Sequence, residues 1–359
     1  MTVKGTPGED VQGTAGSQLG QHYDAKGSLL ARLERAFVEA GCDPDHLSHD
    51  EMAGIDQLHL GGRAASRRLM ALAGWDVAQS TETEHISDKR EGSPLDAVAG
   101  AGSSGAARLL DLGCGTGGAS RLLARDLGYE VVGVDITPGF IEVATWLSQS
   151  CGLEDTTRFV CADAADLPLG DASIEAVWCQ HALLNMPDLA AVLSECRRVL
   201  APGGRLLLHE VVRGDNPAPL SLPVPWARTP EHSRLLSLKD LEQHLQAAGF
   251  QRQALEDVSA EALAWRSHHR RREQGGDGKR AHGGSNTDHA QPQPPAQPLK
   301  SKGDESSPQA SGPAARPPIR PRLPGPALIF GEVFVEMGRN LLDNLADDRV
   351  RVVQGVWQR

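Results

Sequence analysis

Short apolar runs alternate with longer amphipathic segments through the middle of the chain, a pattern typical of an α/β fold. The apolar runs read as strands, whereas apolar residues spaced three or four apart predict helices between them. The predicted strands are Leu109–Leu112, Val131–Val134, Phe159–Ala162, Ala176–Cys179 and Leu206–His209. This alternation predicts a parallel sheet with right-handed crossovers and helices on both faces.

Two amphipathic helices are predicted ahead of the first strand. Ser28 can cap the first helix and Gly41 ends it, while the second follows Gly61 and Gly62. The intervening residues 56–63 read as a polar, glycine-containing turn. The amino-terminal part is therefore expected to be helical.

The segment RLLDLGCGTGGASRLLARDLGYEVVGV, residues 108–134, predicts a strand, a glycine loop, a helix and a second strand. Such a unit binds an adenosine-containing ligand where its parallel strands end. The spacing Gly113-x-Gly115-x-x-Gly118 also fits the dinucleotide fingerprint, so this segment alone leaves the ligand open.

Carboxylates follow the predicted strands at informative places. Asp135 closes the second strand, 20 residues after Gly115, where a carboxylate can accept both ribose hydroxyls. Asp163 follows the third strand, where a carboxylate can accept from an exocyclic adenine amine. A Pro-Gly-Gly turn at Pro202 then leads into the fifth strand.

Composition narrows the class of partner. The net charge of -11, from 36 Lys and Arg against 47 Asp and Glu, argues against nucleic acid. The six cysteines form no C-x-x-C pair and the thirteen histidines lack metal-ligand spacing. No run of 18 apolar residues occurs. We therefore expect a cytoplasmic protein with no metal site, no membrane insertion and no nucleic-acid partner.

Over residues 108–212 the chain resembles the class I S-adenosylmethionine-dependent methyltransferases. The matching motifs are LLDLGCGTGG, VVGVDITPGF, CADAADLPLGDASIEAVWCQH and LAPGGRLLLHE. The chain is most similar to the small-molecule branch, which includes quinone C-methyltransferases and sarcosine/dimethylglycine N-methyltransferases. QHYDAKGSLLARL and DEMAGIDQLHLGGRAASRRLMAL resemble the amino-terminal cap helices of that branch.

The resemblance implies a Rossmann-like, seven-stranded, mostly parallel sheet with the last strand antiparallel, helices on both faces and a helical N-terminal cap. Phe250–Val258 and Val350–Trp357 would be the two remaining strands. The expected segments are a disordered tail (1–20), a helical cap (21–79), a flexible insertion (80–105), the methyltransferase core (106–265), a disordered low-complexity insertion (266–324) and a carboxyl-terminal helix and strand completing the core (325–359).

The cofactor implied is S-adenosyl-L-methionine, and its site residues are carried over from the motifs. The glycine loop would hold the methionine part, the second strand's end the ribose and adenine, and the third strand's end the adenine edge. The residues are Asp111, Gly113, Cys114, Gly115 and Gly117 for methionine, Asp135 and Ile136 for ribose and adenine, Asp163 and Ala164 for the adenine edge, and Gln180 for the methionine end or the substrate. Tyr23 and Arg63 could close over the cofactor or take its carboxylate, or could belong to the surface.

His59 and His181 are the candidate catalytic residues, either as acid–base groups or as packing and positioning residues. The leading function is methyl transfer to an N, O or C atom of a small metabolite. A non-catalytic cofactor-binding module is the alternative. A nicotinamide-dependent dehydrogenase is disfavoured because Asp111, Asp163 and the Pro-Gly-Gly turn are not required by it. The acceptor and the oligomeric state stay open.

Overall fold

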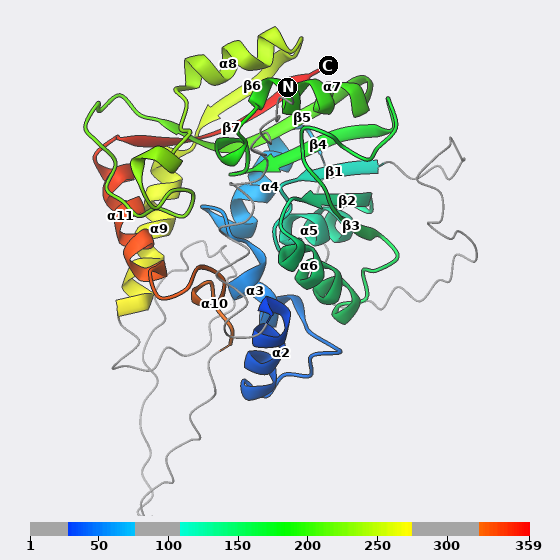
Figure 1. Ribbon diagram of the computed structural model, residues 1–359, viewed down its shortest axis with the longest axis vertical. Helices are drawn as coiled ribbons and strands as arrows, with labels where there is room; N and C mark the ends of the chain where they lie inside the picture. Colours follow the sequence, from blue (N-terminus) through cyan, green and yellow to red (C-terminus); the bar gives the residue numbers. More distant parts are fainter. Residues whose placement is uncertain (1–27, 76–107, 275–322) are drawn as a thin grey trace, which may run out of the picture.

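The computed structural model describes residues 28–75, 108–274 and 323–359, with side chains of the middle range described to Arg271. Its centre is one seven-stranded sheet in the order β3-β2-β1-β4-β5-β7-β6 (Figure 1). The strands are β1 (Arg108–Leu112), β2 (Glu130–Asp135), β3 (Thr157–Cys161), β4 (Ile174–Gln180), β5 (Leu200–Arg213), β6 (Gln251–Asp257) and β7 (Val350–Gln358).

Strand directions match the expected fold. The first five strands pair in parallel, and β7 is antiparallel to both of its neighbours, β5 and β6. The predicted Rossmann-like sheet with its last strand antiparallel is therefore confirmed. The strand order reverses between β1 and β4, and such a switch point is where open α/β sheets bind ligands.

Helices cover both faces of the sheet, as predicted. The helices are α2 (Leu29–Glu39), α3 (His49–Asp56), α4 (Gly62–Leu72), α5 (Gly118–Leu127), α6 (Pro138–Ser150), α7 (Leu189–Val199), α8 (Leu238–Ala247), α9 (Ser259–Gln274), α10 (Ala327–Phe330) and α11 (Phe334–Ala346), with short 3-10 turns at Leu183–Asn185 and Pro230–His232.

Alternation along the strands separates two cores, because successive strand residues point to opposite faces. Leu110, Val177 and Leu208 belong to a core with apolar residues of α7 and α8. Leu109 and Leu207, one residue out of phase, belong to a core with α4 and α5. The α4 face is the one on which the site described below lies.

The amino-terminal helices begin at residues whose side chains satisfy their first backbone amides. Ser28 caps α2, as predicted, by accepting from Ala31 N. Helix α3 was not predicted as an element of its own, although Ser48 and Glu51 form a complete capping box at its start. That pair is the signal that could have found it.

One predicted boundary is wrong. Residues 266–274, assigned to the disordered insertion, continue helix α9 to Gln274. Arg266 is 4% exposed, and its Nε donates to the carbonyl of Gly338 at 3.0 Å, which joins α9 to α11. Tertiary contact therefore orders a segment whose polar composition predicts disorder. The carboxyl-terminal segment also holds two helices before β7, rather than one.

Within the described ranges, no helix is long and apolar enough to cross a membrane.

Candidate functional site

The glycine loop after β1 approaches its neighbours too closely for side chains. The amides of Gly113 and Cys114 donate to the carbonyl of Val134 at 2.8 and 3.0 Å, which fixes the loop to β2. A Cβ at Gly113 would lie 2.5 Å from that of Ala182, beyond β4, and its φ is +72°. Glycine is therefore required there. By contrast, nothing lies within 4 Å of a Cβ placed on Gly115, so that side of the loop is open.

Gly117 and Gly118 bring the loop into contact with the sheet and the cap. A Cβ at Gly117 would lie 2.7 Å from the Phe159 ring, and one at Gly118 would overlap the Asp56 carbonyl. The end of α3 therefore packs on the start of α5. Thr116 adds a hydrogen bond to the carbonyl of Ile55 at 2.8 Å.

Asp111 lies beneath this loop, at 2% exposure. Its carboxylate accepts from the Ser120 hydroxyl at 2.5 Å. Burial, with a smaller contribution from the nearby Asp135 carboxylate, raises the pKa of Asp111 to about 6, against the opposing hydrogen bonds from Ser120. A buried carboxylate whose pKa stays raised despite these hydrogen bonds favours a cation beside it.

Asp135 stands at the end of β2, as predicted. One of its oxygens accepts from Gly115 N at 3.0 Å and the other from Thr137 N at 2.9 Å. Burial raises the pKa of this carboxyl as well. The carboxylate is thus held in place by backbone amides directly beside the open face of the loop.

The adenine-side residues lie next to Asp135. Ile136 is 58% exposed, which is unusual for a large apolar side chain. The end of β3 is tied to β2 by Ala162 N donating to the Asp135 carbonyl at 3.1 Å. Asp163 follows at the surface, accepting from Ala165 N at 2.9 Å. The structure therefore gathers the ends of β1, β2 and β3, with the motif residues on them, at one edge of the sheet.

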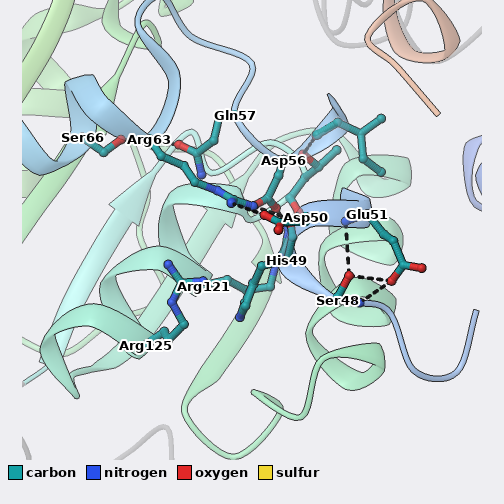
Figure 2. A network of polar contacts seen from close by, with 12 residues as sticks. Ser48, His49, Asp50, Glu51, Asp56, Gln57, Arg63, Ser66, Arg121 and Arg125 are labelled. Atoms are coloured by element: carbon teal, nitrogen blue, oxygen red, sulfur yellow. Dashed lines mark hydrogen bonds and ion pairs between the residues drawn. The ribbon is translucent and has the colours of Figure 1, made fainter. Parts of the chain in front are cut away.

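A buried ion pair joins the cap to this edge (Figure 2). Arg121 of α5 is fully buried, and its Nη2 donates to the carboxylate of Asp56, at the end of α3, and to the carbonyl of Thr116 at 2.7 Å. Its Nη1 donates to the carbonyl of Ala144 in α6 at 3.2 Å. One guanidinium thus holds α3, the glycine loop and α6 together.

Arg63 of α4, a candidate for the cofactor, points toward α3 in the structure (Figure 2). Its Nη2 donates to the His49 carbonyl, and its Nη1 lies 3.5 Å from the Asp50 carboxylate. The second Asp56 oxygen is 3.9 Å away. These contacts place the guanidinium in the cap network. Tyr23 lies outside the described residues.

The acceptor side of the edge, from β4 to β7, carries a different set of groups. Gln180 of β4 is the register partner of His209 of β5, and His209 is the partner of Gln354 of β7. Partners in register share a face, so these three polar side chains form a row. Helix α4 covers the row: Ser66 Oγ donates to Gln180 Oε1 at 3.2 Å, and Gln354 Nε2 donates to the Ala65 carbonyl at 2.7 Å.

Three histidine rings gather at this row. His59 and His181 lie with ring centroids 6.1 Å apart, and His209 is 5.5 and 4.8 Å from them. Burial lowers the pKa of His59 to about 4 and that of His181 to about 3, and takes that of His209 well below its ordinary value. All three imidazoles are therefore neutral at pH 7. No group of side chains in the described ranges is arranged to hold a metal ion.

Three functional-site residues were not predicted from the sequence: His209, Gln354 and the buried Glu210. Glu210 lies on the opposite face of β5, where it accepts from the amides of Ala182 and Leu183 at 3.0 Å, and burial raises its pKa to about 7. The signal for His209 and Glu210 was a pair of polar residues inside an otherwise apolar strand. Polar residues there interrupt a buried run and need partners.

Comparisons with known proteins agree with this geometry. Residues 110–208 match the family model described as a methyltransferase domain. The chain is similar to the methyltransferase GfsG of Streptomyces halstedii, at 33% identity over 54% of this chain and 58% of that protein. It is also similar to the 2-methyl-6-phytyl-1,4-hydroquinone methyltransferase of Synechocystis, at 35% identity over 40% and 46%. The chain thus spans about half the length of these curated relatives.

Solved structures show the same fold. The [4+2]-cyclase SpnF has a TM-score of 0.55 at 21% identity, covering 96% of both chains. A geranyl diphosphate C-methyltransferase from Streptomyces coelicolor has a TM-score of 0.56 at 14% identity, covering 98% of this chain and all of the other. The predicted resemblance to class I methyltransferases is confirmed.

Proposed function

We propose, from the premise that residues 110–208 form a methyltransferase domain, that this chain transfers the methyl group of S-adenosylmethionine to a small metabolite. The observation that carries the proposal is the placement of Asp111 and Asp135 around the open face of Gly115. The buried Asp111 and the half-buried Asp135 flank one loop, and the pKa of each carboxyl is raised. A sulfonium cofactor with an ammonium group supplies positive charge at that position.

The cofactor-binding roles follow from this arrangement. Asp111, Gly113, Cys114, Gly115 and Gly117 would line the methionine part, and the start of α5, which has no side-chain cap at Gly117, would face its carboxylate. Asp135 would exchange part of its backbone hydrogen bonding for the ribose hydroxyls. Ile136 would cover the adenine, whereas Asp163, Ala164 and Gln180 would border its edge and the methionine end.

The chain contributes positioning more than acid–base chemistry. When bound, the cofactor supplies an activated methyl group that an electron-rich atom displaces in line. His59 donates its Nε2 proton toward the Gly62 carbonyl at 3.1 Å, which commits it to the cap backbone. His181 is neutral, but a pKa of about 3 makes it a weak base at pH 7. We therefore assign both histidines to shaping the acceptor side.

The experiment is titration calorimetry with S-adenosylhomocysteine, on the wild-type chain and on Asp135→Ala. The wild type is expected to bind, and the variant to bind at least tenfold more weakly, because it loses hydrogen bonds to a charged group. Asp155→Ala is the matched control, since it removes an exposed carboxylate just ahead of β3. Equal affinity in Asp135→Ala would refute the ribose role, and no binding by the wild type would refute the proposal.

A second candidate is a binding module, or another reaction, on the same fold. Its support is the solved relative named as a [4+2]-cyclase, which shows that this fold carries more than one chemistry. Incubation with methyl-labelled cofactor and a metabolite extract separates the two. Labelled product supports methyl transfer, whereas binding of S-adenosylhomocysteine without any labelled product supports the second candidate.

A cytoplasmic location, a small-molecule acceptor and the lack of a nucleic-acid partner complete the proposal. All six cysteines are free thiols, in keeping with a reducing compartment. The net charge of -11 opposes binding to a phosphate backbone.

A further inference from the structure

The polar row on β4, β5 and β7 interrupts an otherwise apolar sheet face. On the same face, one step earlier along the strands, lie Trp178 and Leu207, both fully buried. The row of Gln180, His209 and Gln354 follows directly. Burying a row of polar side chains on an apolar sheet face is unfavourable unless each polar atom has a hydrogen-bond partner.

Helix α4 satisfies only part of this row. Gln354 uses its amide nitrogen twice, donating to the Ala65 carbonyl and, at 2.6 Å, to His209 Nδ1. Because a carbonyl can only accept, the Gln354 amide orientation is fixed by Ala65. Nδ1 of His209 must then accept, and a neutral imidazole of this kind carries its proton on Nε2. Gln354 is thus a positioning residue that sets the tautomer of His209.

The proton on His209 Nε2 has no acceptor within the described residues, and the atom is buried. His209 as a whole is 1% exposed. The Nε2 of Gln180 is also buried without a partner, because its Oε1 is already taken by Ser66. Two N–H groups on adjacent strands, at the same level of the sheet, therefore lack an acceptor.

We propose that His209 Nε2–H and the Gln180 amide bind an ionised hydroxyl oxygen of the methyl acceptor, so that the acceptor is a phenol or enol rather than an amine. The inference rests on the proposed function and names the acceptor class of the same site. Unpartnered N–H donors in a dry site stabilise negative charge on oxygen. The three neutral imidazoles nearby add no negative charge that would attract an ammonium.

The transfer balances without a basic side chain. The acceptor hydroxyl loses its proton to solvent as it binds as the oxyanion. A remaining lone pair on that oxygen forms the new O–C bond to the methyl carbon, the C–S bond breaks, and sulfur keeps the electron pair. Glu210, the nearest carboxyl, lies on the opposite face of β5 and accepts from backbone amides, so it does not face the oxyanion.

The test uses 4-nitrophenol, whose neutral and ionised forms absorb differently, with the full chain saturated in S-adenosylhomocysteine. At one pH unit below its pKa in solution, the bound probe is expected to be at least half ionised, which corresponds to a shift of at least tenfold in its ionisation constant. 4-Nitroaniline, the matched amine, is expected to bind at least tenfold more weakly.

Variants assign the effect to the donors. His209→Leu removes the N–H group and should abolish the ionisation shift, whereas His209→Gln keeps a donor and should restore most of it. Gln180→Leu, on a different strand, should reduce the shift independently. Glu256→Gln is the control: Glu256 is the register partner of Gln354 on β6, but pairs with Arg68 at 3.0 Å and is 42% exposed.

The outcomes separate the two proposals. Failure of the wild type to bind S-adenosylhomocysteine overturns the proposed function itself. Binding of S-adenosylhomocysteine, but with 4-nitrophenol bound neutral or not bound, overturns only the acceptor assignment. The same holds if 4-nitroaniline binds equally well, or if His209→Gln behaves like His209→Leu. Should His209→Leu lose S-adenosylhomocysteine binding, the other two variants decide. The acceptor assignment then requires that His209→Gln keeps most of the ionisation shift and that Gln180→Leu reduces it.

Discussion

The two halves of the sheet's carboxyl edge have opposite chemistry. From β3 to β1 the edge carries the carboxylates Asp163, Asp135 and Asp111, and the pKa values of the half-buried Asp135 and the buried Asp111 are raised. From β4 to β7 it carries neutral imidazoles and amides, with buried N–H groups that have no acceptor in the described chain. The first half suits a cation and the second an anionic oxygen. The switch point between β1 and β4 places the two side by side.

The halves also differ in how the cap is attached to them. At the carboxylate half the cap is bound through the buried pair of Asp56 and Arg121, and through backbone contact at Gly118. At the acceptor half the polar contacts of α4 with the row are single hydrogen bonds to Gln180 and Gln354. Removing one member of a buried pair leaves an uncompensated charge, whereas losing one neutral hydrogen bond costs less. The stability of the cap should therefore depend mainly on the carboxylate half.

The largest expected effect is on Arg121→Met. The variant leaves the Asp56 carboxylate buried without its partner, so the free energy of unfolding should fall by about 3–5 kcal/mol. The melting temperature should fall by roughly 6 °C or more in a thermal scan. Arg125→Met, on the same helix but 28% exposed in its pair with Asp126, is the matched control and should lose about 1 kcal/mol or less.

A double variant checks the cause. Adding Asp56→Asn to Arg121→Met removes the unpaired charge and should recover part of the lost stability. A double variant that is less stable than Arg121→Met alone would show that the guanidinium acts through its contacts with the backbone, not through the charge of Asp56.

Asp111→Asn should stabilise the fold and weaken the cofactor site. The folded pKa of about 6 lies above the usual value of 3.8, so the wild type loses stability as pH rises through that window. The variant should therefore be more stable by about 3 kcal/mol at pH 8, with the advantage vanishing near pH 4. Urea unfolding at several pH values measures it. An advantage that does not change with pH would contradict the assigned pKa.

The raised pKa of Asp111 also determines how the affinity for the cofactor should depend on pH. A cationic ligand favours ionised Asp111, so affinity for S-adenosylmethionine should fall as pH drops below about 6. Calorimetry at pH 5 and 8 should show this fall for the wild type and a smaller one for Asp111→Asn. Equal pH dependence in the two proteins would place the titrating group elsewhere, for which Asp135 is the next candidate.

The carboxylate half could be predicted from sequence, and the acceptor half could not. Gly113, Gly115 and Asp135 are close together in the chain or at fixed distances along it, so their spacing carries the signal. The acceptor half joins Ser66, Gln180 and Gln354 from segments more than 100 residues apart. Only strand register brings them together, and no local pattern encodes register between distant strands.

Helix ends follow the same division. Ser28 was predicted as a cap, and both Ser28 and Ser237 cap their helices through hydrogen bonds that are local in sequence. Thr137, at the start of α6, makes no side-chain cap, and its amide donates to Asp135 at the binding site. Helix α9 continues through the segment predicted as disordered because of α11, which lies about 70 residues away.

The smallest expected effect is on Arg63→Ala. Its guanidinium contacts the His49 carbonyl and the mostly exposed Asp50 carboxylate, both in the cap. We infer that it supports the cap and does not hold the cofactor carboxylate. The variant should lose about 1 kcal/mol or less in unfolding free energy and keep its affinity for S-adenosylhomocysteine within twofold. A tenfold loss of affinity with unchanged stability would instead assign Arg63 to the cofactor, and would extend the binding site from the carboxylate half into the cap.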